Sequence, residues 1–319
     1  MLGMKQLFWK QRPPGKVIAG WFVAIFAAMP VHAVEVQFNK VVDGVYAFIG
    51  ETGARSESNE GLNANLGLVV TTDGAVLIDS GATFQGARQI HEAIRRVTNQ
   101  PVKWVINTGG QDHRWLGNGY FFSQGAEVLA HAAGQADMVS RGGDHVAGLR
   151  QVLGVKVDGT DPTFPSQWIQ GKDVTLTLGG VTFQFKHRGG AHTPGDMLVW
   201  LPQQRVVFSG DVVYVDRMLG VLPISNTKHW LETFAEMERL APVHIVPGHG
   251  RVSNLGKAQV ETRDYLTALR AHMRKAVDEG ADISTAIKSF DSKPFMHLLN
   301  AAELMPGNGS RTYLEVERE

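Results

Sequence analysis

The chain has 319 residues, and its apolar fraction of 43% supports a substantial core in one large domain or two small ones. Lysine plus arginine and aspartate plus glutamate both number 31, so the formal net charge is zero. Residues 1–33 carry basic residues and no acidic one, and without them the balance is about −4. This balance argues against nucleic acid or anionic lipid as the main partner, because both bind through clusters of basic residues.

Residues 1–33 have the pattern of a cleavable export signal. Basic residues precede an apolar run at 17–29, which is shorter than the ~20 residues that a membrane span needs. Pro30 ends the run, and Val-His-Ala at 31–33 offers small residues for a signal peptidase. We predict a signal peptide at 1–33, one domain at 34–319, and a periplasmic protein with no stable membrane anchor after cleavage. An uncleaved N-terminal anchor is the alternative.

The chain contains no cysteine. An exported protein without cysteine is stabilised by its core and not by disulfides. Any bound metal must then be held by nitrogen and oxygen ligands, which resist the oxidation that destroys a thiolate ligand.

Short apolar runs alternate with turn residues along the predicted domain. The runs predict two hairpins, one from the strands at 66–70 and 75–79 and one from the strands at 174–178 and 181–185. They predict further strands at residues 45–50, 102–106, 127–131, 197–201, 205–208 and 244–246. Helical patterns lie at residues 86–98, 134–155 (a helix and covering loop), 231–240, 257–278, 281–289 and 310–317. Two sets of strands with interspersed helices predict an α/β fold, a four-layer αββα sandwich with helices outside two packed sheets.

Four segments place metal-ligand types directly after an expected strand. They are NTGGQDHRWLGN at 107–118, GGAHTPGD at 189–196, FSGD at 208–211 and VPGHG at 246–250. Glycine lets the backbone turn close to a ligand, and functional groups concentrate in such loops. Imidazoles with one or two carboxylates suit zinc, with manganese or iron as alternatives. The candidate ligands are Asp112, His113, His192, Asp211 and His249.

These segments resemble those of the metallo-β-lactamase-fold hydrolases, both in their residues and in their order along the chain. The resemblance extends over nearly all of the chain from about Val45. The resemblance implies that fold and hydrolysis by a metal-activated water. VLIDSG at 76–81 resembles the strand whose aspartate supports the metal loop, which implies that role for Asp79. The string at 107–118 resembles the exported branch that is associated with quinoprotein (PQQ-dependent) oxidation systems.

The segment at 107–118 departs from the H-x-H-x-D-H pattern of the family, and two alignments remain open. Without a gap, Gly109 and Gln111 replace the paired histidines, His113 takes the aspartate position and Arg114 takes the last histidine position. A shift by one residue matches Asp112 and His113 to the Asp-His pair and loses only the H-x-H half.

In either alignment the first of two metal sites keeps only His192, helped at most by the Gln111 amide oxygen, so we expect one ion. We assign Asp112 as a ligand and as the carboxylate that orients the water and moves its proton, with a loop-capping carboxylate as the alternative. Arg114 is either a clamp for a substrate anion or a surface salt bridge. Thr193 and Asp196 are expected to satisfy backbone groups of their turn.

The remaining histidines of the domain are expected to be ordinary hydrogen-bonded residues. His145 is expected to be a solvated loop residue, with a ligand reaching in from the covering loop as the alternative. The others are His91, His131, His187, His229, His244, His272 and His297.

Two functions from different classes are consistent with these patterns. The first is a mononuclear zinc hydrolase that cleaves an ester, thioester, lactone or amide of a small exported metabolite. The second is a non-catalytic metal- or cofactor-binding accessory protein of a periplasmic quinoprotein system, since a fold alone does not guarantee the reaction. A β-lactamase is a weaker third hypothesis because the first-site histidines are missing. The oligomeric state is not predicted.

Overall fold

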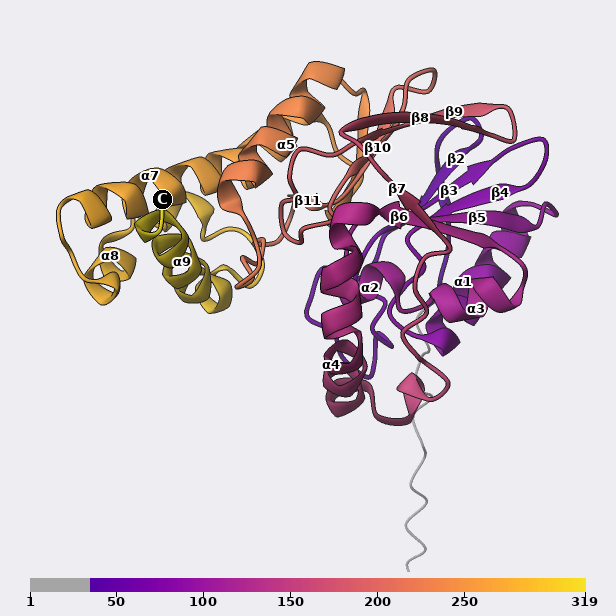
Figure 1. Cartoon of the computed structure of the whole chain (residues 1–319), viewed down its shortest axis with the longest axis horizontal. Helices are drawn as coiled ribbons and strands as arrows, with labels where there is room; N and C mark the ends of the chain where they lie inside the picture. The colour runs from indigo at the N-terminus through magenta and orange to yellow at the C-terminus, as the bar shows by residue number, and fades with distance from the viewer. Residues whose placement is uncertain (1–34) are drawn as a thin grey trace, which may run out of the picture. The chain divides into compact units, whose positions relative to one another are not determined.

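Two β-sheets form the centre of the computed structural model, which describes residues 35–319 (Figure 1). The predicted signal peptide at 1–33 lies outside the described residues. The larger sheet contains, in spatial order, β1 (Asn39–Val42), β2 (Val45–Phe48), β3 (Leu66–Val70), β4 (Ala75–Ile78), β5 (Val102–Asn107), β6 (Glu127–His131) and β7 (Gln167–Ile169). The smaller sheet contains β12 (His244–His249), β11 (Val206–Tyr214), β10 (Leu198–Leu201), β9 (Val181–Lys186) and β8 (Asp173–Leu178).

Side chains of the central strands alternate between two buried layers, because successive residues of a strand point to opposite faces. On β4, Val76 and Ile78 belong to the apolar cluster between the sheets. Ala75 and Leu77 belong instead to the cluster between the larger sheet and its helices. Strands that are buried on both faces read as continuous apolar runs, which is why the sequence located them.

Helices cover the outer face of each sheet (Figure 1). The cluster outside the larger sheet includes residues of α1 (Phe84–Val97) and α3 (Asn118–Ser123), and the cluster outside the smaller sheet includes residues of α5 (Thr227–Leu240), α7 (Asp264–Asp278) and α9 (Ala301–Glu317). The other helices are α2 (Asp112–Trp115), α4 (Gln135–Leu153), α6 (Leu255–Ala258) and α8 (Ile283–Ser289), with short η1 (Ala132–Gly134), η2 (Gly154–Val157), η3 (Gln259–Arg263) and η4 (Lys293–Phe295). The predicted αββα sandwich is confirmed.

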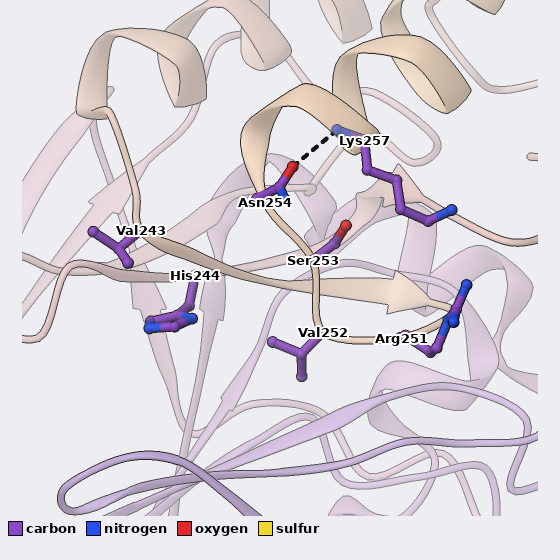
Figure 2. Close-up of a pocket in the computed structure, with 7 residues that line it drawn as sticks. All are labelled: Val243, His244, Arg251, Val252, Ser253, Asn254 and Lys257. Atoms are coloured by element: carbon purple, nitrogen blue, oxygen red, sulfur yellow. Dashed lines mark hydrogen bonds between the residues drawn. The ribbon is translucent and has the colours of Figure 1, made fainter.

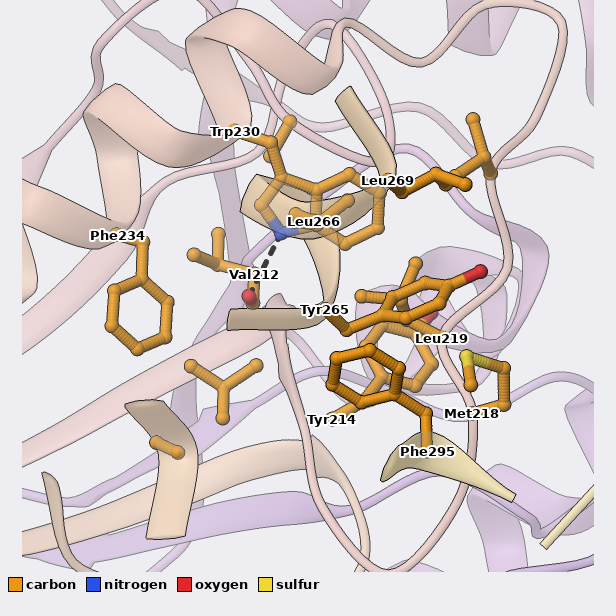
Figure 3. Packing of buried hydrophobic residues seen from close by; sticks show 14 of the residues in the cluster. Val212, Tyr214, Met218, Leu219, Trp230, Phe234, Tyr265, Leu266, Leu269 and Phe295 are labelled. Carbon is orange, nitrogen blue, oxygen red and sulfur yellow. Dashed lines mark hydrogen bonds between the residues drawn. The ribbon is translucent and has the colours of Figure 1, made fainter. Parts of the chain in front are cut away.

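The helices outside the smaller sheet are anchored by large buried aromatic residues (Figure 3). The Trp230 indole is fully buried, and its Nε1 donates to the Val212 carbonyl at 2.8 Å. The rings of Tyr265 and Phe295 meet edge to face with centroids 5.1 Å apart. A buried indole N–H needs such a partner, so this bond ties α5 to the strand that also carries Asp211.

The structure differs from the predicted elements in several places, including β12, which continues through His249 where a turn was expected. β11 continues through 208–211, where a turn was expected, because Gly210 adopts φ +50° and the register with β12 shifts there without ending the pairing. Residues 112–115, expected to be loop, form α2. α9 begins at Ala301, well before the predicted start, although Pro306 lies inside it. β1, β7 and α3 were not predicted because they are short and mixed in polarity.

We predict that Gly67→Ala lowers the free energy of unfolding by about 1–3 kcal/mol, because the methyl group would overpack the core between the sheets. A Cβ at Gly67 would lie 2.2 Å from Cε1 of Phe208 on the opposite sheet. Urea denaturation measures the change. Gly143→Ala is the control, since Gly143 lies exposed on α4 with no atom within 4 Å of an added Cβ. Equal stability of the two variants would contradict the prediction.

Candidate metal centre

Three of the predicted ligands meet where strands of the two sheets end. His113 lies on α2, just after β5, whereas Asp211 lies within β11 and His249 ends β12. One ligand atom from each lies within 4.8 Å of the other two, and all three side chains are buried. β11 and β12 are parallel neighbours, so Asp211 and His249 reach the same edge of their sheet.

The ligand atoms of this group of three lie close enough together to surround one metal ion. Nε2 of His113 lies 3.0 Å from Oδ2 of Asp211, and Nε2 of His249 lies 3.3 Å from Oδ1. Around zinc, with ligand bonds of ~2.0–2.2 Å, neighbouring ligand atoms of a tetrahedron lie roughly 3.3–3.6 Å apart. A zinc ion bound there would take an imidazole nitrogen of His113, one of His249 and one Asp211 oxygen, which lie within 4.8 Å of one another.

Backbone carbonyls orient two of the predicted histidine ligands. Nδ1 of His249 donates to the Asn63 carbonyl at 2.8 Å, and Nδ1 of His192 donates to the Gly220 carbonyl at 2.8 Å. Each Nε2 then carries the lone pair that a metal ligand needs. Burial lowers the pKa of His249 to about 3 and the pKa of His192 to about 4, so both imidazoles are neutral at pH 7.

The structure does not bring Asp112 into the group of three. Its Oδ1 accepts a hydrogen bond from the His113 backbone N–H at 2.8 Å and lies 3.3 Å from His113 Nδ1, while Oδ2 binds Arg55. Burial alone would raise the pKa of Asp112, but Arg55 and His113 hold it well below its usual range. Asp112 is thus a fixed anion behind the His113 imidazole, where we predicted a ligand and a proton acceptor. A paired carboxylate of such low pKa is a poor base.

His192 is also outside the group of three, although it is buried beside Tyr214 and Trp230 with ring centroids 6.0 and 5.6 Å away. It is the one histidine left from the first metal site of the family pattern. The predicted helper Gln111 donates its Nε2 to Asp112 Oδ1 at 3.3 Å, and its Oε1 is buried without a hydrogen-bond partner.

Asp196 closes the rest of the first metal site. A Cβ on Gly109 would lie 2.1 Å from Oδ1 of Asp196, so this carboxyl group occupies the space where a histidine side chain would begin. The carboxyl group accepts hydrogen bonds from the Thr193 backbone N–H at 2.8 Å and the Thr193 hydroxyl at 2.5 Å, as predicted for this turn. Burial raises the pKa of Asp196 to about 8, so this carboxyl group holds its proton to a higher pH than an ordinary aspartate.

Arg114 is the centre of a buried charge network, with 1% of its surface exposed. Its Nε and Nη2 donate to the two oxygens of Asp211 at 3.2 and 2.6 Å, and its Nη1 donates to Asp79 Oδ2 at 3.0 Å. The carbonyls of Asn65 and Gly248 each accept from it at 3.0 Å. Both predictions for Arg114, a substrate clamp and a surface salt bridge, are wrong because every donor group faces the protein interior.

The Arg114 network maintains the charge of a ligand. Burial alone would raise the pKa of Asp211, but Arg114 and His113 hold it well below its usual range. The geometry also matches the ungapped alignment, since His113 reaches Asp211 while Asp112 turns toward Arg55.

Asp79 supports the loop that carries His113. It has a left-handed backbone with φ +62°, a conformation that a non-glycine residue keeps only when its surroundings hold it. Its carboxylate accepts from the Thr108 backbone N–H at 2.7 Å and the Thr108 hydroxyl at 2.8 Å, in addition to Arg114. Asp79 therefore lies behind the ligands, where the family resemblance placed it.

The position of His145 differs from the predicted one. It is a buried residue of α4, not a solvated loop residue, and its Nε2 lies 2.8 Å from Arg141 Nη1. Its ring lies 6.3 Å from that of Trp115, and it does not belong to the group of three.

Two arginines beside the group were not singled out from the sequence. Arg55 lies on the loop after β2, and Arg217 lies just after β11. Charge interactions link Arg217 to Asp211 and His249. No motif marks an arginine in an irregular loop, so the sequence offered no signal for either.

The pocket in Figure 2 lies elsewhere and contains none of the predicted ligands. Asn254 caps α6 there by accepting the Lys257 backbone N–H at 3.1 Å, and Arg251 pairs with Asp216. These contacts belong to the surface of the fold and bring no metal-ligand group together. The residues that line this pocket are Val243, His244, Arg251, Val252, Ser253, Asn254 and Lys257.

Comparisons with known proteins agree on one family. A model described as the metallo-β-lactamase superfamily matches residues 59–249, a segment that contains the whole group of three. A metallo-β-lactamase type 2 from Elizabethkingia meningoseptica is 22% identical over 219 residues, 67% of this chain and 79% of that protein. The type 2 enzyme from Bacteroides fragilis is 28% identical over 81 residues, so the chain matches only 32% of its length.

Solved structures share the fold. The sec-alkylsulfatase Pisa1 from Pseudomonas sp. has a TM-score of 0.68 at 17% identity, over 87% of this chain and 50% of that one. The metallo-β-lactamase FIM-1 from Pseudomonas aeruginosa, in its mono-zinc form, has a TM-score of 0.59 at 20% identity, over 74% of this chain and 96% of that one. At these identities the likeness shows the fold alone.

We predict that Arg114→Met lowers the free energy of unfolding by about 3–5 kcal/mol, because Asp79 and Asp211 would lose their buried counter-ion. Urea denaturation in the presence of a chelator measures the loss. Arg251→Met is the control, since Arg251 is 76% exposed and pairs with Asp216 at the surface, and its effect should stay within ~1 kcal/mol. A loss at Arg114 no larger than the loss at Arg251 would disprove the structural role.

We predict that the chelated protein loses stability as the pH falls from about 6.5 toward 4. The pKa values of His187, His192 and His249 are lowered in the folded chain, so at these groups the unfolded chain binds more protons over this range. Their sum outweighs Asp196, whose raised pKa acts in the opposite direction. The slope is at most about 1.4 kcal/mol per pH unit for each histidine. Urea denaturation at pH 7, 6 and 5 tests this, and His192→Asn should show a shallower dependence than the wild type. An identical dependence in both proteins would exclude a contribution from His192.

Proposed function

We propose, from the premise that this chain belongs to the metallo-β-lactamase superfamily of metal-dependent hydrolases, that it works with a single zinc ion. His113, Asp211 and His249 would hold the ion, with manganese or iron as alternatives. The observation that carries the proposal is the buried group of three, with ligand atoms within 4.8 Å of one another and His249 oriented by a backbone carbonyl.

A zinc ion held there would supply a water of lowered pKa and would polarise the oxygen of the scissile group. Other residues of the chain hold the three ligands in the charge state and orientation that metal binding needs. Arg114 keeps Asp211 ionised, and Asp112 lies against the outer nitrogen of His113. Asn63 holds His249 in the tautomer that exposes Nε2. The result is a preorganised donor set in a buried position.

One ion per chain is favoured over two by the contacts at the first site. The Asp196 carboxyl group lies where a side chain at Gly109 would begin, and His192 alone does not complete a site. FIM-1 is described in a mono-zinc form, and we extend that stoichiometry to this chain.

The substrate that we propose is an ester, thioester, lactone or amide of a small metabolite, encountered in the periplasm. The location rests on the predicted signal at 1–33, and the link to a quinoprotein (PQQ) oxidation system rests on the resemblance at 107–118. Among residues 35–319, no helix is both long and apolar enough to cross a membrane.

A non-catalytic accessory protein of that system is the second candidate. One observation favours it: Arg114 engages both oxygens of Asp211 with charge-assisted hydrogen bonds, which compete with a metal ion for this carboxylate. Under this hypothesis the chain binds a metal or cofactor without turnover.

We predict that the mature protein binds about one zinc per chain and that His249→Ala loses it, because one of three ligands is removed. Chelator-sensitive hydrolysis should fall with the metal, on the order of 10²-fold or more. Elemental analysis and a panel of esters, thioesters, lactones, amides and β-lactams measure both. His244→Ala is the control, since His244 begins the same strand but lines the pocket in Figure 2. Zinc binding without turnover would support the accessory role, and absence of any bound metal would exclude the hydrolase.

A further inference from the structure

A cavity of about 290 Å³ lies between α7, α8 and α9, in the helical layer outside the smaller sheet. These three helices pack against one another (Figure 1). None of the residues that line the cavity belongs to the metal centre. The cavity is therefore a candidate binding site that is separate from the group of three.

Apolar side chains form most of the cavity wall. Leu269 and Met273 of α7 and Met305 of α9 belong to the buried cluster outside the smaller sheet, so the wall continues into the core. Met296 also lines the cavity, although 47% of its surface is exposed. Methionine is flexible and polarisable, so it adapts to the shape of an apolar guest. A concave apolar surface that opens to water is the usual form of a small-molecule site.

The space exists because α9 turns small residues toward its neighbours. Ala302, Pro306 and Gly309 line the cavity and recur at helical spacing, which places them on one side of α9. An added Cβ at Gly309 would lie 3.2 Å from both Ile287 Cγ1 and Met273 Cε, so the three helices are in contact at that point. The backbone positions of packed helices, and not a movable loop, therefore set the size of the cavity.

Lys288 is the only charged side chain among the residues that line the cavity. It is exposed and forms no ion pair with any residue in the described part of the chain. Ser292 lines the same cavity, and its hydroxyl forms no hydrogen bond with residues 35–319. An ammonium and a hydroxyl both donate hydrogen bonds, so together they complement a ligand with an apolar body and an anionic oxygen group.

The volume limits the length of such a ligand. At ~30 Å³ for each non-hydrogen atom, the volume that a water molecule takes in the liquid, the cavity holds roughly ten such atoms. Octanoate is of this size. The cavity would bury a chain of that length, whereas a longer chain would extend into water.

We propose that the cavity between α7, α8 and α9 binds a small anionic amphiphile, a medium-chain carboxylate such as octanoate. Its chain would contact Met273, Met296 and Met305, and its carboxylate would accept hydrogen bonds from Lys288 and Ser292. This binding site depends neither on zinc nor on hydrolysis.

The first test is calorimetric titration of the mature protein with butanoate, hexanoate, octanoate and dodecanoate. Affinity should rise about fourfold for each added CH₂ up to octanoate, because each CH₂ leaves water for the cavity. It should level off at dodecanoate, whose chain exceeds the volume. Octanol and octylamine have the same chain as octanoate and should bind at least ~3-fold more weakly, since neither offers an anion to Lys288.

Substitutions with matched controls locate the site. Ala302→Phe should weaken octanoate binding at least ~10-fold, because the ring fills the cavity, whereas Ala147→Phe places the same ring on an exposed residue of α4 and should not. Lys288→Gln should weaken binding about 3-fold or more. Lys275→Gln changes an exposed lysine of α7 outside the cavity and should leave binding unchanged.

Methyl NMR of protein labelled at methionine needs no variant. Octanoate should shift the methyl signals of Met273, Met296 and Met305, and should leave that of Met197, which is buried between the sheets, unchanged. Circular dichroism shows whether each variant is folded. If Ala302→Phe is not folded, Lys288→Gln and the methyl signals decide.

Four results would each overturn the inference. They are equal affinity for butanoate and octanoate, octanol binding as tight as octanoate binding, unchanged binding in a folded Ala302→Phe variant, and methyl shifts confined to methionines outside the cavity. None of these results bears on the metal centre, whose zinc content and turnover are measured separately.

Discussion

The buried guanidinium of Arg114 is the interaction on which the rest of the site depends. It joins the end of β4 through Asp79, β11 through Asp211 and β12 through the Gly248 carbonyl, so one side chain connects both sheets. Buried ions are costly to desolvate, and such a network persists only when its donors and acceptors are satisfied. Here the network also holds the pKa of Asp211 low, and a metal site requires an ionised carboxylate.

The same region shows how a common fold can carry a specialised site. The first metal position is closed by the Asp196 carboxyl group beside Gly109, whereas the second keeps three ligands within 4.8 Å of one another. Only the side chains at a few strand ends differ from the pattern that the family resemblance implies. Activity therefore has to be argued from the site, since many chemistries share one fold.

Local pattern predicted the strands well because the central strands of both sheets are buried on both faces, while the edge strand β8 alternates exposed and partly buried residues. The hairpin of β3 and β4 and the hairpin of β8 and β9 combined apolar runs with glycine turns, and both pair as predicted. The extension of β11 through Gly210 was missed, because glycine after a strand reads as a turn unless a parallel neighbour keeps the pairing. His145 was misplaced for a related reason: glycine-rich α4 is helical through packing against its neighbours, and its own propensity is weak.

The sequence alone determined the fold class, the family resemblance and the segments in which metal-ligand types follow strands, because all of these are written in local periodicity and short motifs. It left open which of Asp112 and His113 faces the other ligands. Only the tertiary structure decided this point. The direction of a side chain in an irregular loop depends on partners far along the chain, such as Arg55 for Asp112 and Asp211 for His113.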